Sequence, residues 1–290
     1  MRIVRAKTAG FCMGVSLALR QLDAALKTHK NTGALRSGSR LATLGPVIHN
    51  PRVISEYEDL GVVCLDSTAE THSGDLVLVR AHGVPKEEEQ DLLHRGATVI
   101  DATCPKVKKA QLTIAAEREK CGATLLLYGE KDHPEVKGLV SYADNDARVF
   151  LSREEFEAVA LDPARDYFLA AQTTQDILGF EVICARASER LGHAIPTLQT
   201  ICDATRKRQA EVLELTREVE LLVVVGGSNS GNTRRLAEVA EGRGIPALRI
   251  EDASELDPAR LKAFSVVGVT AGASTPAKHI DDVEAWLRNL

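Results

Sequence analysis

Residues 221–236 read LLVVVGGSNSGNTRRL: an apolar run, a glycine-rich loop and a polar segment that opens a helix. The same order occurs twice earlier in the chain, as LATLGPVIHNPRV at 41–53 and TLLLYGEKDHPEV at 124–136. A short apolar run between turn signals, followed by a helical pattern, is typical of a buried strand in a parallel sheet. The three stretches therefore predict an α/β fold built from repeated units.

Three cysteines follow a second repeated pattern, a β-rich run that ends in a cysteine and leads into a helical segment. The three stretches are RIVRAKTAGFCMGV at 2–15, GATVIDATCPKV at 96–107 and AIPTLQTICDAT at 194–205. Their cysteines, Cys12, Cys104 and Cys202, are separated by 92 and 98 residues. Gln111 and Gln209 follow the second and third cysteine at the same offset. Three cysteines in register are difficult to explain by core packing, so we expect them to act as ligands.

The two patterns together divide the chain into three similar small domains, near 1–95, 96–192 and 193–290. We expect each to hold about four strands in a mainly parallel sheet, with helices between the strands. Polar residues follow these strands, at the edge where open α/β sheets bind ligands. A pseudo-threefold packing of the domains would bring the marked loops to one centre.

The composition excludes several classes of protein. The chain has 290 residues, of which 44% are hydrophobic and 27% charged, and its formal net charge of −5 gives no general attraction to nucleic acid or to an anionic membrane. Aromatic residues make up only 4% of the chain, which argues against a stacking surface for single-stranded nucleic acid. No apolar run reaches membrane-spanning length, and the N-terminus lacks an apolar signal region. We therefore expect a cytoplasmic protein without a nucleic-acid or membrane partner.

The six cysteines include no C-x-x-C pair, so a disulfide scaffold is not expected. Cys64, Cys121 and Cys184 lie in apolar or helical settings outside the register, and we interpret them as structural. Three thiolates without a fourth suit an iron–sulfur cluster with one open iron. A zinc ion held by three protein ligands and a water fits the same set, and the spacing does not separate the two metals.

Three histidines, His49, His82 and His133, each fall in a loop after a predicted strand. Ser230 takes the position of His49 and His133 in the third unit. Such loops expose backbone N–H groups at a helix start, and histidines add donors for phosphate oxygens. Metal ligation by the histidines is a less favoured interpretation.

The loop GGSNSGNT has the glycine spacing of a P-loop, but Asn232 stands where a nucleotide-binding loop needs lysine. Ser230 and Asn232 therefore predict a phosphate cradle without nucleotide hydrolysis.

Two further residues have two interpretations each. Glu135 is either a helix-start carboxylate that offsets the dipole or a proton donor, and Thr173 is either a helix cap or a site residue.

The motifs of this chain together resemble the LytB/IspH family of 4-hydroxy-3-methylbut-2-enyl diphosphate reductases, and the resemblance covers nearly the whole chain. The matching motifs, in chain order, are GFCMGV, GPVIHN, RAHGV, DATCP, HPEVKG, QTT, TIC-AT--RQ, GGSNSGNT and TAGAST. The resemblance implies a three-domain trefoil around a central iron–sulfur site, with one 4Fe–4S cluster per chain, three cysteine ligands and one open iron. The ligands implied are Cys12, Cys104 and Cys202.

The resemblance also implies the reaction and the remaining site residues. The family removes the substrate hydroxyl with two electrons and two protons and forms isopentenyl and dimethylallyl diphosphate in the non-mevalonate isoprenoid pathway. Glu135, Thr173 and His133 are implied to be catalytic. The allylic diphosphate is implied to bind His49, His82, His133, Thr173, Ser230, Asn232 and Ser274. A ferredoxin or flavodoxin is implied as electron donor.

Two other functions remain open for the same residues. A non-enzymatic iron–sulfur sensor or binding protein uses the three cysteines but gives no role to Glu135. A zinc hydrolase of a phosphorylated substrate needs a metal-bound water and histidine ligands.

Overall fold

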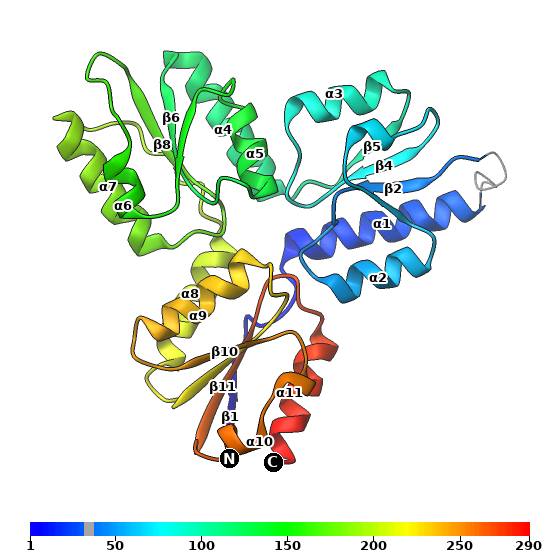
Figure 1. The fold of residues 1–290 in the computed structure, drawn as a ribbon, viewed down its shortest axis with the longest axis vertical. Helices are drawn as coiled ribbons and strands as arrows, with labels where there is room; N and C mark the ends of the chain where they lie inside the picture. The colour runs from blue at the N-terminus through cyan, green and yellow to red at the C-terminus, as the bar shows by residue number, and fades with distance from the viewer. Residues whose placement is uncertain (32–37) are drawn as a thin grey trace. The chain divides into compact units, whose positions relative to one another are not determined.

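The computed structural model describes residues 1–31 and 38–290, which form two compact units (Figure 1). The terminal unit consists of Met1–Ser16, His49–Ile54 and Cys202–Leu290. The central unit consists of Leu17–Ile48 and Ser55–Ile201. Among the helices of the described residues, none is long and apolar enough to cross a membrane.

The terminal unit contains a parallel sheet with the strand order β1-β11-β9-β10. Its strands are β1 (Arg2–Arg5), β9 (Leu221–Val225), β10 (Ala247–Ile250) and β11 (Val266–Ala271). Its helices are α8 (Asp203–Leu215), α9 (Gly231–Glu241), α10 (Pro258–Leu261) and α11 (Ala277–Arg288). Helices α8 and α9 cover one face of the sheet and α11 covers the other (Figure 1).

The apolar run LLVVV forms strand β9 because both faces of this sheet are covered. Leu222 and Val224 pack into the core beneath α8 and α9. Leu221, Val223 and Val225 pack into the core beneath α11. A strand buried on both faces needs an unbroken apolar run, which is the pattern of central strands in parallel sheets.

The central unit contains two sheets, both parallel. The first has the order β3-β2-β4-β5 and consists of β2 (Leu41–Leu44), β3 (Val63–Leu65), β4 (Leu76–Val79) and β5 (Thr98–Asp101). The helices along this stretch of chain are α1 (Met13–Asn31), α2 (Pro51–Asp59) and α3 (Lys86–His94). Leu44, Val77, Val79 and Leu92 are among the residues of its core.

The second sheet of the central unit has the order β7-β6-β8. It consists of β6 (Thr124–Tyr128), β7 (Ala147–Phe150) and β8 (Tyr167–Ala171). Its helices are α4 (Pro105–Cys121), α5 (Pro134–Ser141), α6 (Arg153–Ala158) and α7 (Ile177–Leu191). Helices α4 and α5 cover one face, and α6 and α7 cover the other (Figure 1).

The predicted α/β fold with three small, parallel sheets is confirmed, and so are the three strand–loop–helix stretches. The β-rich run expected at 194–200 forms only an isolated bridge between Leu169 and Thr197. Pro196 lies in this run and has no N–H to give to a ladder, which limits pairing. Two of the sheets include a strand from another of the predicted sequence repeats. Strand β1 pairs with β11, and β5 pairs with β4. The division near 1–95, 96–192 and 193–290 stays a prediction.

Candidate active site

Backbone hydrogen bonds link the loops that follow β2, β4 and β5 in the central unit. The N–H of Ala81 donates to the carbonyl of Val47 at 3.2 Å, and the N–H of Cys104 donates to the carbonyl of Ala81 at 2.9 Å. His82 directly follows Ala81, so one loop residue positions both the histidine and the cysteine. Neighbouring parallel strands end at the same sheet edge, which is why these loops meet.

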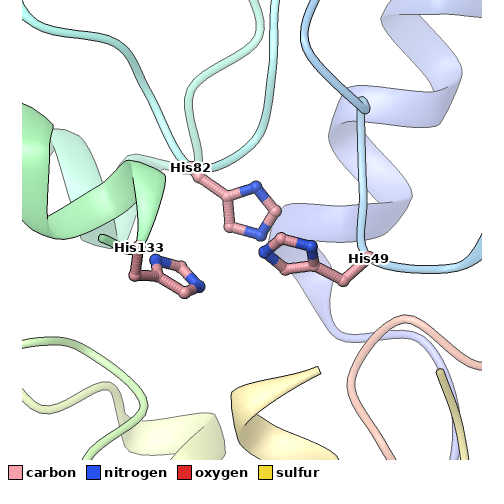
Figure 2. Close-up of side chains that lie close together, drawn as sticks. All are labelled: His49, His82 and His133. Atoms are coloured by element: carbon pink, nitrogen blue, oxygen red, sulfur yellow. The ribbon is translucent and has the colours of Figure 1, made fainter. Parts of the chain in front are cut away.

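His82 and His133 meet at the carboxyl ends of strands from two different sheets of the central unit. His82 follows β4, and His133 lies directly before α5 (Figure 2). Their ring centroids are 5.4 Å apart and the rings are nearly perpendicular. Two of the predicted diphosphate ligands thus lie within reach of one small anion.

His133 is the N-cap of α5, with Pro134 as the first helical residue. Its Nδ1 accepts a hydrogen bond from the backbone N–H of Glu135 at 3.1 Å. An Nδ1 that accepts leaves the proton of the neutral ring on Nε2. The cap therefore holds the ring with an N–H donor turned away from the helix.

Glu135 is buried, with 1% of its surface exposed, and is bonded to Thr173. Its Oε1 accepts the backbone N–H of Thr173 at 2.6 Å, and its Oε2 accepts the Thr173 hydroxyl at 3.0 Å. Burial raises the pKa of Glu135 to about 7, while the two bonds from Thr173 oppose the rise. The carboxyl group is therefore poised between its acid and its base form at neutral pH.

The cap interpretation of Thr173 is wrong. The helix that follows, α7, is capped by Asp176, whose carboxylate accepts the N–H of Gly179. Thr173 instead bonds Glu135 across two loops. Glu135 does lie in the first turn of α5, yet its burial and its two bonds distinguish it from an exposed glutamate that merely offsets the helix dipole.

Two glycines allow close packing around the loops of the central unit. Gly45 has φ +69°, and a Cβ there would collide with the guanidinium of Arg80. Gly83 has φ +72°, and a Cβ there would stand 2.6 Å from the amide nitrogen of Gln111. Side chains at either position would displace the loops that carry His49 and His82.

In the terminal unit, His49 and Ser274 are joined. The Ser274 hydroxyl donates to the carbonyl of His49 at 2.9 Å, and the side-chain amide of Asn50 donates to the carbonyl of Ser274 at 3.0 Å. Gly227 approaches this pair so closely that a Cβ would stand 2.8 Å from the His49 carbonyl oxygen. In this arrangement the Ser274 hydroxyl has to rotate before it donates to a ligand.

The loop before α9 also belongs to the terminal unit and presents Ser230 and Asn232. Ser230 is the N-cap of α9, and its hydroxyl oxygen accepts the N–H of Thr233 at 3.3 Å. The amide nitrogen of Asn232 is buried and has no hydrogen-bond partner in the described part of the chain. An orphaned buried donor at a helix N-terminus fits an anion such as phosphate.

Thr233 differs from the hydroxyl of a P-loop. It is fully buried, and its side chain packs against Gly226 and Gly272. It therefore fills the space beside the two glycines and contributes to the packing of the two loops. The absence of lysine at Asn232 and the burial of Thr233 both separate this loop from nucleotide-hydrolysing ones.

Each of the three cysteines in register directly precedes a helix, as predicted. Cys12 precedes α1 and Cys202 precedes α8 in the terminal unit, and Cys104 precedes α4 in the central unit. None of the three forms a disulfide, and all three are partly exposed. Helix N-termini favour thiolates, and thiolates are the form that binds metal.

The remaining cysteines lie elsewhere. Cys64 is on β3, Cys184 is on α7 and Cys121 is the exposed last residue of α4. Burial raises the pKa of the Cys64 and Cys184 thiols, which favours the protonated, unreactive form.

Gln172 lies beside the candidate site and had no predicted role. It is fully buried directly before Thr173, and its Oε1 accepts the N–H of Glu130 at 3.0 Å. This bond ties the loop of Glu135 to the loop of Thr173. The only signal in the sequence was its place in the QTT motif.

The chain matches the family described as LytB protein over residues 3–288. It is 53% identical over 291 residues to a protein of Nitratidesulfovibrio vulgaris and 52% identical over 290 residues to one of Desulfovibrio desulfuricans, with full coverage of both chains. A protein of Geobacter metallireducens is 40% identical over 100% of this chain and 98% of its own. All three are named 4-hydroxy-3-methylbut-2-enyl diphosphate reductase.

Two solved structures share the fold. The E-1-hydroxy-2-methyl-but-2-enyl-4-diphosphate reductase of Plasmodium falciparum has a TM-score of 0.90 at 24% identity and covers 98% of this chain and 87% of its own. A structure of (E)-4-hydroxy-3-methyl-but-2-enyl diphosphate reductase has a TM-score of 0.68 at 34% identity, with full coverage of both chains. The resemblance seen in the motifs is confirmed, and this chain belongs to the LytB protein family.

Proposed function

We propose that this chain is an iron–sulfur oxidoreductase that converts 4-hydroxy-3-methylbut-2-enyl diphosphate to isopentenyl and dimethylallyl diphosphate in the non-mevalonate isoprenoid pathway. Full-length likeness to relatives named for this activity supports the proposal. Within the molecule, the observation that carries it is the buried pair of Glu135 and Thr173. Loss of a hydroxyl as water needs a proton donor at neutral pH, and this pair provides one.

We propose Cys12, Cys104 and Cys202 as the ligands of one 4Fe–4S cluster per chain, with one iron left open. The donor set fits, because three thiols outside any disulfide each stand directly before a helix N-terminus. When bound, the cluster supplies the electrons and a Lewis-acidic site for the leaving oxygen.

Glu135 is the proposed proton donor, and Thr173 orients it. With its pKa raised to about 7 by burial, the carboxyl group is protonated in a large share of the molecules at neutral pH and can take up a proton again after each turnover. A positioned acid of matched pKa typically contributes about 100- to 10,000-fold to a rate. His133 is the third proposed catalytic residue, since its cap geometry keeps Nε2–H turned away from α5.

The proposed diphosphate ligands all offer hydrogen-bond donors. They are His49, His82, His133, Thr173, Ser230, Asn232 and Ser274. Support comes from the unpartnered buried amide of Asn232 and from the approach of the His82 and His133 rings. Charge-assisted bonds from several such donors are the usual way to hold a diphosphate.

A ferredoxin or flavodoxin is the proposed electron donor, and the cytoplasm is the proposed location. The sensor alternative gives no role to the bonded pair of Glu135 and Thr173, and the zinc-hydrolase alternative is distinguished by its metal content. The relatives with which the chain aligns over its full length are also named as reductases.

The first test is the content of iron and acid-labile sulfide in anaerobically purified protein. About four of each per chain supports the cluster. Zinc without sulfide supports the hydrolase instead, and the absence of any metal after anaerobic reconstitution contradicts the ligand set.

The second test is turnover of the Glu135→Gln variant with a reduced donor. We expect the cluster to be retained and turnover to be lost. Glu154→Gln is the matched control, because Glu154 lies in the first turn of α6 in the same unit but is exposed. Wild-type turnover in Glu135→Gln would remove the assigned role of Glu135.

A further inference from the structure

Arg208 is a buried cation in α8 that the proposed reaction does not yet use. Only 5% of its surface is exposed, whereas its neighbour Lys207 is exposed. Arg208 belongs to the TICDATRKRQ stretch that begins two residues before Cys202. Buried arginines are rare unless a partner compensates for the lost hydration, so its surroundings matter.

The guanidinium of Arg208 joins the two cysteine-bearing segments of the terminal unit. Its Nη2 donates to the carbonyl of Gly10 at 2.6 Å, and its Nη1 makes a longer contact of 3.4 Å with the carbonyl of Ala204. Gly10 lies two residues before Cys12, and Ala204 lies two residues after Cys202. The planar guanidinium group therefore connects the segment before Cys12 with the start of α8.

The positive charge of Arg208 lacks a carboxylate partner. Its Nε is buried without a hydrogen bond, and across residues 1–31 and 38–290 no carboxylate forms an ion pair with it. The nearest acidic residue along the helix, Glu211, is engaged by the backbone N–H groups of Lys7 and Thr8 at 2.7 and 2.9 Å. A buried guanidinium without a counter-charge is costly, and an anion beside it would compensate for that cost.

Cys12 and Cys202 are the groups placed to provide that anion. Burial lowers the pKa of Arg208, and the strongest opposing charges are those of Cys12 and then Cys202, ahead of Glu211. A cubane held by three thiolates is anionic when oxidised and gains a further negative charge on one-electron reduction. Net charge and nearby donors are among the factors that set the potential of such clusters.

We propose that Arg208 is the fixed counter-charge of the cluster and stabilises its reduced state, which makes the cluster easier to reduce. This inference rests on the proposed function, because it takes Cys12 and Cys202 as cluster ligands. The step concerned is the uptake of one electron from a reduced ferredoxin- or flavodoxin-type protein, which is itself oxidised by one electron. Arg208 does not exchange protons in this step and acts through its permanent charge.

The test is an anaerobic redox titration of the loaded protein, followed by electron paramagnetic resonance, in three variants beside the wild type. Arg208→Gln removes the charge and keeps hydrogen-bond donors, and Arg208→Lys keeps the charge without the fork. Lys207→Gln removes an exposed charge from the same helix. We expect Arg208→Gln to lower the equilibrium constant for reduction at least tenfold, a shift of about 59 mV to more negative potential for a one-electron couple. Arg208→Lys and Lys207→Gln should stay within about half of that shift.

An Arg208→Gln variant that is fully loaded and reduced at the wild-type potential overturns the inference alone. A shift of equal size in Lys207→Gln also overturns it, because the effect would then follow from net charge at any distance. If Arg208→Gln takes up no cluster, the iron and sulfide content of the variants becomes the readout. A cluster in Arg208→Lys then supports the role of the positive charge. The absence of a cluster in both variants contradicts that role. A wild-type protein that takes up no iron or sulfide overturns the proposed function, and this inference with it.

Discussion

Thr173 donates two hydrogen bonds to Glu135, a residue 38 positions earlier in the chain. The backbone N–H and the hydroxyl of Thr173 donate to different carboxylate oxygens, so the two bonds together fix the orientation of the carboxyl group. Burial is the larger influence and favours the protonated acid, while the two bonds favour the carboxylate. The balance places the pKa of Glu135 at about 7.

Turnover should depend on the protonated form of Glu135. Because burial raises the pKa of this group to about 7, we expect kcat to be high below pH 7 and to fall about tenfold per pH unit above it. The measurement is a pH–rate profile at fixed electron-donor potential, with the iron content of each sample determined in parallel. A profile that stays flat from pH 6 to pH 9 with intact cluster contradicts the assignment.

Stability should also respond to Glu135. Its pKa is about 7 in the folded protein and near 4.5 when unfolded, so the folded state binds the proton more tightly. The contribution of Glu135 to the free energy of unfolding is therefore greatest below pH 4.5. It declines as the pH rises to 7, by on the order of 3 kcal/mol in total. Glu135→Gln does not titrate and should unfold at higher urea concentration than the wild type at pH 8. Equal midpoints at pH 5 and pH 8 for both proteins would argue against a buried titrating carboxyl.

Thr173→Val removes the hydroxyl bond to Glu135 and keeps the β-branched shape. Since this bond favours the carboxylate, its loss raises the pKa of Glu135 further, and the alkaline limb of the pH–rate profile should move to higher pH. We expect turnover at pH 7 to fall about 10- to 100-fold through misorientation of the acid. Thr173→Ser keeps the hydroxyl and is the control. An unmoved limb in Thr173→Val would mean that the hydroxyl does not act on Glu135.

Substitutions at Asn232 and Ser230 should distinguish a residue that binds the diphosphate from one that also caps helix α9. The amide nitrogen of Asn232 has no partner in the described residues, so Asn232→Ala should leave stability unchanged and raise KM about 10- to 100-fold, the value of one hydrogen bond to a charged group. Ser230→Ala also removes the N-cap of α9 and should cost about 0.5–2 kcal/mol of stability. Urea unfolding and steady-state kinetics on both variants provide the comparison. A destabilised Asn232→Ala variant with unchanged KM would assign Asn232 to the fold.

Local patterns were sufficient to predict most elements of the fold. The apolar runs at 41–44, 124–128 and 221–225 form buried strands, and each is followed by a helix. The helices after Cys104 and Cys202 were likewise predicted, because Pro105 and Asp203 directly behind these cysteines are typical of a helix start, and the helix after Cys12 was predicted from the repeat. The run at 194–200 was overestimated, since proline and its loop position leave it with one bridge.

The site was predicted in its residue types but not in its connections. The motifs point to Glu135 and Thr173 separately and leave two interpretations for each, whereas the hydrogen bonds between them identify a single bonded pair. Gln111, Gln172 and Arg208 had no assigned role, because a buried polar side chain has no signature that periodicity detects. Gln172 and Arg208 are bonded to other segments of the same unit, and Gln111 lies close to Gly83 of another loop.

The sequence by itself determined the α/β class, the repeated strand–loop–helix order, the three cysteines in register and the family. These features depend on residues close together in the chain, where hydrophobic period, turn residues and helix-start preferences act. The tertiary structure alone decided that β1 pairs with β11, that Glu135 is bonded to Thr173, and that Arg208 is buried between the segments of Cys12 and Cys202. Burial and the distance between charges control these properties, and both arise only when distant segments pack together.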